Sequence, residues 1–123
     1  SVKLESLGNE LFAVSKGFKY KINKEIEGPL KAYLNKEVDL GIRPEFIGVS
    51  LDGKKDDSYL CDATIEFVEP QGTHSILITH IEGEEVKIMT TEYMDIRPNT
   101  RVSLYVKDGK AMFFDKETTK RIK

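Results

Sequence analysis

The sequence predicts a mainly β fold with one short helix, organised as two interlocked β lobes. Three observations support this fold class. Apolar and polar residues alternate in several short runs, turn residues separate these runs, and only one segment shows helix-like spacing. Alternation with a period of two places successive side chains on opposite faces of a strand, so it is typical of half-buried strands.

Four runs show this alternation most plainly. In each run we expect the apolar side chains to face the core and the intervening polar side chains to face solvent. The apolar members are Phe18, Tyr20 and Ile22; Val38, Leu40 and Ile42; Cys61, Ala63, Ile65 and Phe67; and Val102, Leu104 and Val106.

Turn residues connect the predicted strands. Gly8-Asn9 separates residues 4–7 from 11–14, and Gly83 separates 76–81 from 86–89. The strongest signal is Asp108-Gly109, because glycine readily adopts the positive φ that a two-residue turn needs. This pair predicts a hairpin between residues 102–106 and 112–114.

One segment, residues 25–34, has the spacing of a helix. Ile26, Leu30 and Tyr33 recur at intervals of three or four residues. Gly28 weakens the first turn, and proline is suited to the first position of a helix. The helix is therefore expected to begin only at Pro29.

The polar stretch Asp52 to Ser58 contains no apolar residue and is expected to be a loop or hinge. It divides the chain into lobe-like parts at about 1–51 and 58–123. Each part alone would bury too little surface to be stable. Residues 1–123 are therefore interpreted as a single domain.

Composition narrows the class of protein. A net charge of −2 and a pI near 5.7 argue against a surface that neutralises many phosphates, as in general nucleic-acid binding. The single cysteine, Cys61, cannot form an internal disulfide, which indicates a reducing, cytosolic compartment. No apolar run approaches the roughly 18 residues of a membrane span. Because the first residue is Ser1 and not Met, we expect a piece of a longer protein.

One segment resembles a phosphate-binding loop. Gly48 to Lys55 nearly matches G-x-x-x-x-G-K-[ST], but Lys55 stands where a magnesium-binding hydroxyl is required. The acidic residues that follow do not predict an apolar helix whose N-terminus could support phosphates. A surface loop is the favoured interpretation, and no catalytic, cofactor-binding or metal-binding residue is predicted.

Other candidate residues have simpler explanations. His74 and His80 would lie about 20 Å apart on one strand, too far to share a metal, and Cys61 is expected to be a small buried thiol. The carboxylates of Asp56-Asp57 and Glu84-Glu85 are expected to be solvated. The roles of Cys61, His74 and His80 stay open.

The segment Lys16 to Lys24, KGFKYKINK, mixes basic and aromatic residues as single-strand binders do. Strand alternation places Phe18 and Tyr20 on one face and Lys19 and Lys21 on the other. The aromatic face is therefore expected to belong to the core, and nucleic-acid binding is not favoured.

Three blocks, in order, resemble one known family. They are LGIRPE at residues 40–45, IEFVEPQG at 65–72 and FFDKET at 113–118. Together they are similar to the C-terminal regulatory domain of ATP-binding subunits of ABC transporters that import sugars, such as maltose and glycerol-3-phosphate importers. Phe46, Met112 and Thr119 depart from the family pattern, and glycine is common where Thr119 stands.

The resemblance implies an OB-like small barrel of the kind called the transport-associated OB (TOBE) domain. It implies a regulatory domain without ATPase activity, because this chain has no intact phosphate loop and no LSGGQ-type signature. ATP and magnesium would belong to an absent N-terminal module. The implied partners are a second copy, membrane permease subunits and a regulatory protein, at the inner face of the cell membrane.

The corner Arg43-Pro44-Glu45 is the candidate interface for a second copy or another partner. Pro44 lacks an amide donor and is expected to end the strand that contains Leu40. The alternative is that Arg43 and Glu45 pair locally. Two other functions remain open, namely sensing of a small anion or ligand by an importer ATPase and, with less support, nucleic-acid binding by an OB-type module.

Overall fold

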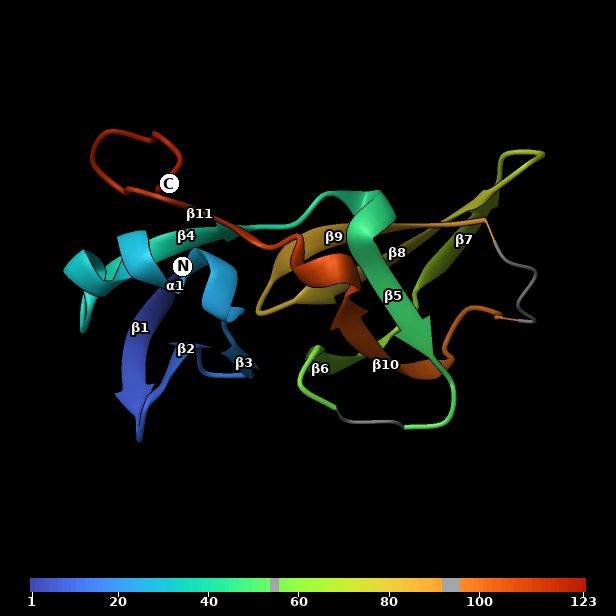
Figure 1. Cartoon of the computed structure of the whole chain (residues 1–123). Coiled ribbons are helices and arrows are strands. Elements are labelled where there is room, and N and C mark those ends of the chain that lie inside the picture. The colour runs from blue at the N-terminus through green and yellow to red at the C-terminus, as the bar shows by residue number, and fades with distance from the viewer. Residues whose placement is uncertain (54–55, 92–95) are drawn as a thin grey trace.

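The computed structural model describes residues 1–53, 56–91 and 96–123. These residues form one short α-helix, three 3₁₀ turns and three antiparallel sheets (Figure 1). The prediction of a mainly β fold with one short helix is confirmed. None of the helices in the described ranges is long and apolar enough to cross a membrane.

The first sheet contains the N-terminal strands and the last strand of the chain. Its order is β11-β4-β1-β2-β3. The strands span Val2–Leu7 (β1), Glu10–Val14 (β2), Lys19–Lys21 (β3), Glu37–Gly41 (β4) and Met112–Phe114 (β11). Gly8, at φ 65°, allows the tight turn between β1 and β2, as predicted.

The other two sheets have three strands each within the described part of the chain. One has the order β5-β10-β6 and the other β7-β8-β9. Their strands are Ile47–Ser50 (β5), Tyr59–Thr64 (β6), Phe67–Pro70 (β7), Ser75–Ile81 (β8), Glu84–Thr90 (β9) and Arg101–Val106 (β10). The predicted β8–β9 hairpin forms, with Glu82 and Gly83 both at positive φ in its turn.

The predicted hairpin at Asp108-Gly109 is wrong. Strand β10 pairs with β5 and β6, whereas β11 pairs with β4 in a different sheet. Asp108 and Gly109 do adopt positive φ, in the 3₁₀ turn Lys107–Gly109 (η3). Turn residues determine the local backbone path but not the partner of the following strand, and here the chain crosses from one sheet to another.

The helix also begins earlier than predicted. Helix α1 spans Lys24–Leu30 and continues as the 3₁₀ turn Lys31–Tyr33 (η1). Asn23 is the N-cap, and its side-chain oxygen accepts a hydrogen bond from the amide of Glu25 at 3.0 Å. This cap satisfies an amide that would otherwise lack a partner, so the helix begins before Pro29, which lies in its last turn.

The alternation from Cys61 to Phe67 does not continue to its end. Cys61, Ala63 and Ile65 are buried, but Phe67 is 60% exposed. Strand β6 ends at Thr64, and the chain enters another sheet at Phe67, so one periodicity does not cover both strands. Ser103, expected on the polar face of β10, is buried and donates a hydrogen bond to Asp62.

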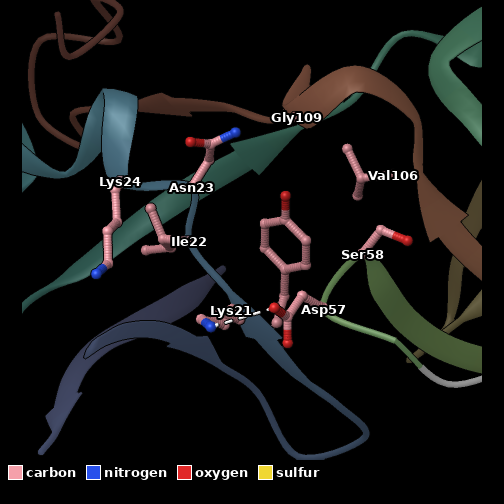
Figure 2. Close-up of a pocket in the computed structure, with 9 residues that line it drawn as sticks. Lys21, Ile22, Asn23, Lys24, Asp57, Ser58, Val106 and Gly109 are labelled. Carbon is pink, nitrogen blue, oxygen red and sulfur yellow. Dashed lines mark hydrogen bonds and ion pairs between the residues drawn. The ribbon is translucent and has the colours of Figure 1, made fainter. Parts of the chain in front are cut away.

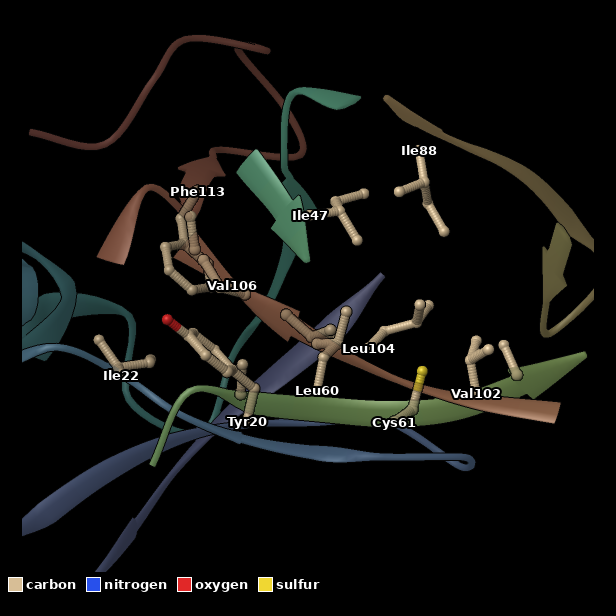
Figure 3. Packing of buried hydrophobic residues seen from close by; sticks show 14 of the residues in the cluster. Tyr20, Ile22, Ile47, Leu60, Cys61, Ile88, Val102, Leu104, Val106 and Phe113 are labelled. Atoms are coloured by element: carbon tan, nitrogen blue, oxygen red, sulfur yellow. The ribbon is translucent and has the colours of Figure 1, made fainter. Parts of the chain in front are cut away.

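The core is one cluster that connects all three sheets (Figure 3). Leu4, Val38 and Phe113 enter it from the first sheet, Leu104 from the second and Ile88 from the third. Strands from both sides of the polar loop 52–58 share sheets, since β5 pairs with β10 and β11 with β4. The two parts of the chain are thus joined by hydrogen bonds as well as by packing.

Candidate functional site

The corner Arg43-Pro44-Glu45 lies between β4 and β5. Strand β4 ends at Gly41, before Pro44, and Pro44–Phe46 forms a 3₁₀ turn (η2) in which the amide of Phe46 bonds to the carbonyl of Arg43 at 2.9 Å. Arg43 and Glu45 are exposed, and Pro44 is half-buried. Within residues 1–53, 56–91 and 96–123, neither charged side chain has an ion pair or a hydrogen bond. Both groups are available to a partner.

A cleft of about 410 Å³ lies between the end of β3 and the region around η3 (Figure 2). Its lining residues are Tyr20, Lys21, Ile22, Asn23, Lys24, Asp57, Ser58, Val106 and Gly109. A Cβ atom at Gly109 would lie 2.5 Å from Nδ2 of Asn23, so only glycine allows this close approach. The cleft combines an apolar floor with amide, hydroxyl and ammonium groups.

The charge in this cleft is largely neutralised. The ammonium group of Lys21 lies 3.1 Å from Oε1 of Glu10 and 3.3 Å from Oδ2 of Asp57. Its hydrogen bonds, first to Glu10 and then to Asp57, raise the pKa of Lys21. Lys24 is exposed in the same cleft. The hydroxyl and the amide of Ser58 both donate hydrogen bonds to the carboxylate of Asp56. The polar groups of the cleft are thus mostly engaged with each other or with their neighbours.

The basic and aromatic segment 16–24 contributes to the core, as predicted. Tyr20 is 2% exposed, and burial raises its pKa. Phe18 is half-buried and packs against the core. On the other side of the strand, Lys19 lies 4.8 Å from the centre of the Phe12 ring. The rings of Phe18 and Tyr20 therefore do not form the exposed stacking platform that single-stranded nucleic acids need.

The segment that resembles a phosphate loop begins inside strand β5. Gly48 is buried opposite Tyr105, and a Cβ atom added to it would lie 2.1 Å from Cζ of that ring. The glycine thus makes room for an aromatic side chain of the neighbouring strand. Lys54 and Lys55 lie outside the described residues.

The residues considered as metal ligands do not gather. Cys61 is buried, and burial raises its pKa to about 11, so it remains a neutral thiol. His80 pairs with Glu66 at an exposed position, whereas His74 lies next to Thr73. The part of the chain that the structure describes holds no group of three His, Cys, Asp or Glu able to bind a metal ion. Asp57, Glu84 and Glu85 are exposed, as predicted.

Sequence reasoning missed two carboxylates with structural roles. Glu82 accepts hydrogen bonds from the hydroxyl of Ser15 and, at 2.9 Å, from the amide of Gly17. These bonds lower the pKa of Glu82, and the bond from Ser15 has the largest effect. The two hydrogen bonds connect the turn of the β8–β9 hairpin to the loop between β2 and β3. No local signal could reveal this contact, because more than sixty residues separate the partners.

Asp115 organises the C-terminal turn. Its Oδ1 accepts hydrogen bonds from the backbone amides of Glu117 and Thr118 at 2.8 and 2.9 Å. Its Oδ2 accepts a hydrogen bond from the hydroxyl of Tyr33 at 2.8 Å. Its pKa is lowered, first by the Thr118 amide and next by Tyr33. The aspartate and threonine of the block FFDKET therefore shape a turn beneath the buried Phe113.

These features define a small, mainly β domain with surfaces suited to binding and no assembled catalytic group among the residues described. The chain belongs to the TOBE domain family, whose model matches residues 40–114. The matched region begins at the LGIRPE block and ends within the FFDKET block, so the predicted family is confirmed.

Curated relatives of the chain are ATP-binding proteins. The sn-glycerol-3-phosphate import ATP-binding protein UgpC 2 of Agrobacterium fabrum is 34% identical over 87 residues, which cover 71% of this chain and 22% of the relative. An uncharacterised ABC transporter ATP-binding protein, y4oS of Sinorhizobium fredii, is 33% identical over 70% of this chain and 21% of its own length. The chain thus spans about a fifth of the curated relatives that it matches.

A solved structure has the same fold. The cytoplasmic molybdate-binding protein ModG, crystallised with molybdate bound, superimposes with a TM-score of 0.68 at 16% identity, covering 91% of this chain and 89% of that chain. At this identity the likeness concerns the fold alone.

Proposed function

We propose that this chain is the non-catalytic regulatory and dimerisation domain of an ATP-binding subunit of an ABC transporter of the sugar-importer class. The observation that carries the proposal is the 34% identity to a glycerol-3-phosphate import ATP-binding protein over most of this chain. ATP and magnesium would bind in a separate module of the parent protein. That parent would lie in the cytoplasm at the inner membrane face and contact the permease subunits.

The exposed corner is the proposed contact between two copies. Arg43 and Glu45 carry opposite charges two residues apart, and neither is neutralised within the described part of the chain. A two-fold contact brings the same patch of both subunits together. Arg43 of each copy can then meet Glu45 of the other, which makes the corner self-complementary.

The proposal can be tested by transplanting the chain. In the Agrobacterium fabrum relative, the segment that aligns with this chain would be replaced by residues 1–123, and the hybrid compared with a version truncated before that segment. The hybrid is expected to form subunit dimers at lower concentration than the truncated protein, measured by sedimentation without nucleotide. Equal association of the two would contradict a dimerisation role.

A second candidate function is binding of a small oxyanion. It is favoured by the fold shared with ModG, which binds molybdate, and by the exposed ammonium group of Lys24 in the 410 Å³ cleft, where the carboxylate of Asp57 is paired with Lys21. Calorimetric titration with molybdate, and with sulfate for comparison, would test it. Saturable heat that disappears in Lys24→Gln would support this function, and no heat with either anion would exclude it for these ions.

A further inference from the structure

A second cleft, here called the hairpin groove, lies where the β4–η2 segment faces the β8–β9 hairpin. Its volume is about 500 Å³, within the roughly 300–1,000 Å³ typical of ligand-binding clefts. Strand β9 packs against η2 beside it, and Figure 1 shows β4 running toward the β9 side of the molecule. Leu40, Ile42 and Pro44 line it on the β4–η2 side, and Glu84, Glu85 and Val86 line it on the hairpin side.

The floor of the hairpin groove is apolar. Ile47 and Leu60 are buried below it, while Leu40, Ile42 and Val86 are only partly buried and pack against the core. The last three therefore have one side in the core and another open to the groove. Partly covered aliphatic side chains gain free energy when a partner removes their remaining surface from water.

The rim of the groove is acidic on the hairpin side. Glu84 and Glu85 are exposed, and no ion pair or hydrogen bond holds either side chain in the described part of the chain. Glu82 is fixed by Ser15 and Gly17 and forms part of the wall. The cations among the described lining residues are Lys87 and the α-ammonium group of Ser1, so the three carboxylates of Glu82, Glu84 and Glu85 outnumber them.

We propose that the hairpin groove binds a peptide segment of a partner protein in which apolar side chains are flanked by Lys or Arg. The apolar side chains would fill the floor beside Ile42, and the cations would pair with Glu84 and Glu85. Protein contacts commonly combine a few apolar anchors in a pocket with a polar rim. Opposite charge at the rim raises the association rate and rejects partners of like charge. The proposal is independent of the assignment to an importer ATPase.

The test uses the whole chain and three short synthetic peptides. One alternates lysine with leucine, one alternates glutamate with leucine, and one alternates lysine with serine. Binding is followed by amide chemical shifts in ¹⁵N-labelled protein. Only the lysine–leucine peptide is expected to bind, with the largest shifts at Ile42, Val86 and their neighbours. Equal binding of the glutamate–leucine peptide, or shifts centred elsewhere, would overturn the proposal.

Variants separate charge from fold. The double variant Glu84→Gln, Glu85→Gln is expected to bind the peptide about three- to tenfold more weakly at low salt. The control is the double variant Glu25→Gln, Glu117→Gln, at exposed sites outside the groove. It should bind the peptide as the wild type does. Ile42→Thr should weaken binding while the thermal transition is retained. Equal affinity in the groove and control variants would contradict the proposal. Shifts at Val86 and Lys87, on the hairpin side of the groove and outside the corner at residues 43–45, on raising protein concentration without peptide would assign the groove to a second copy instead.

Discussion

Gly48 is needed for the packing of strand β5 against Tyr105. Tyr105 on the neighbouring strand covers it, and a Cβ atom would lie 2.1 Å from the ring. Gly28 is different, because a Cβ atom there would meet nothing within 4 Å. The two glycines therefore respond in opposite ways to the same substitution.

Gly48→Ala is expected to lower the free energy of unfolding by about 1–3 kcal/mol, as overpacking does in other cores. Gly28→Ala should raise it by about 0.5–1 kcal/mol, because alanine favours a helix interior over glycine. Urea denaturation of both variants measures the difference. If Gly48→Ala were as stable as Gly28→Ala, the close contact with Tyr105 would be wrong.

Thr119 departs from the family pattern at a position where glycine has a physical advantage. Its φ is 60°, in the left-handed region that a β-branched residue rarely adopts. Thr119→Gly is therefore expected to raise the free energy of unfolding by roughly 0.5–1 kcal/mol. Thr118 has a negative φ, and its hydroxyl oxygen accepts a hydrogen bond from the amide of Lys120. Thr118→Gly should therefore lower the free energy of unfolding. Thermal unfolding of both variants checks the sign, and a destabilised Thr119→Gly would contradict the account.

At the scale of elements, Glu82 connects the β8–β9 hairpin to the β2–β3 loop. Its folded-state pKa lies below the ordinary value of 4.5. A lowered pKa stabilises the fold above the unfolded-state pKa, and this stabilisation is lost as pH falls through the lower, folded-state value. Because the group is exposed, the effect should stay below about 1 kcal/mol.

Glu82→Gln is thus expected to reduce stability at pH 7 and to make less difference at an acidic pH below 4.5, because the wild-type carboxylate becomes protonated as pH falls through its lowered pKa. Urea midpoints at both pH values provide the measurement. Glu85→Gln is the control, since Glu85 is exposed and its side chain has no hydrogen bond or ion pair in the described residues. A loss that is equal at both pH values would show that the carboxylate charge is not involved.

Predictability from sequence depended on how local each contact is. The β8–β9 hairpin could be predicted because its strands are adjacent and Gly83 lies in the turn. The pairing of β11 with β4 could not, because the Asp108-Gly109 turn is equally compatible with a hairpin. Phe67 was misplaced because alternation does not report where one sheet ends and another begins. At the candidate site, the exposed corner was predictable from Pro44, whereas the contacts of Glu82 were not.

The polar loop between β5 and β6 should accept added residues. Gly53 is exposed and has open space around it. Insertion of a short Gly-Ser segment after Gly53 is expected to cost only about 0.6 kcal/mol even if the loop doubles in length. The thermal transition should remain cooperative and shift slightly. Its collapse would show that the loop is packed against the domain.

At the scale of the whole molecule, residues far apart in the chain complete the same sheets. Strand β11 extends the N-terminal sheet, and β5 joins strands from the second half. One core cluster connects the three sheets. This arrangement holds the corner at residues 43–45 between two strands of different sheets, β4 and β5, which supports its use as a rigid contact surface.

Sedimentation equilibrium over a wide concentration range tests the central claim most directly. The wild-type chain is expected to show a mass that rises above 14.0 kDa with concentration. Arg43→Glu should remain folded, by thermal unfolding, and lose this rise, because two corners of like charge repel. Lys36→Glu, the same reversal of charge at another exposed position, should associate as the wild type does. A wild-type chain that stays at the mass of one chain throughout, or an Arg43→Glu variant that associates equally well, would contradict a dimerisation role for this corner.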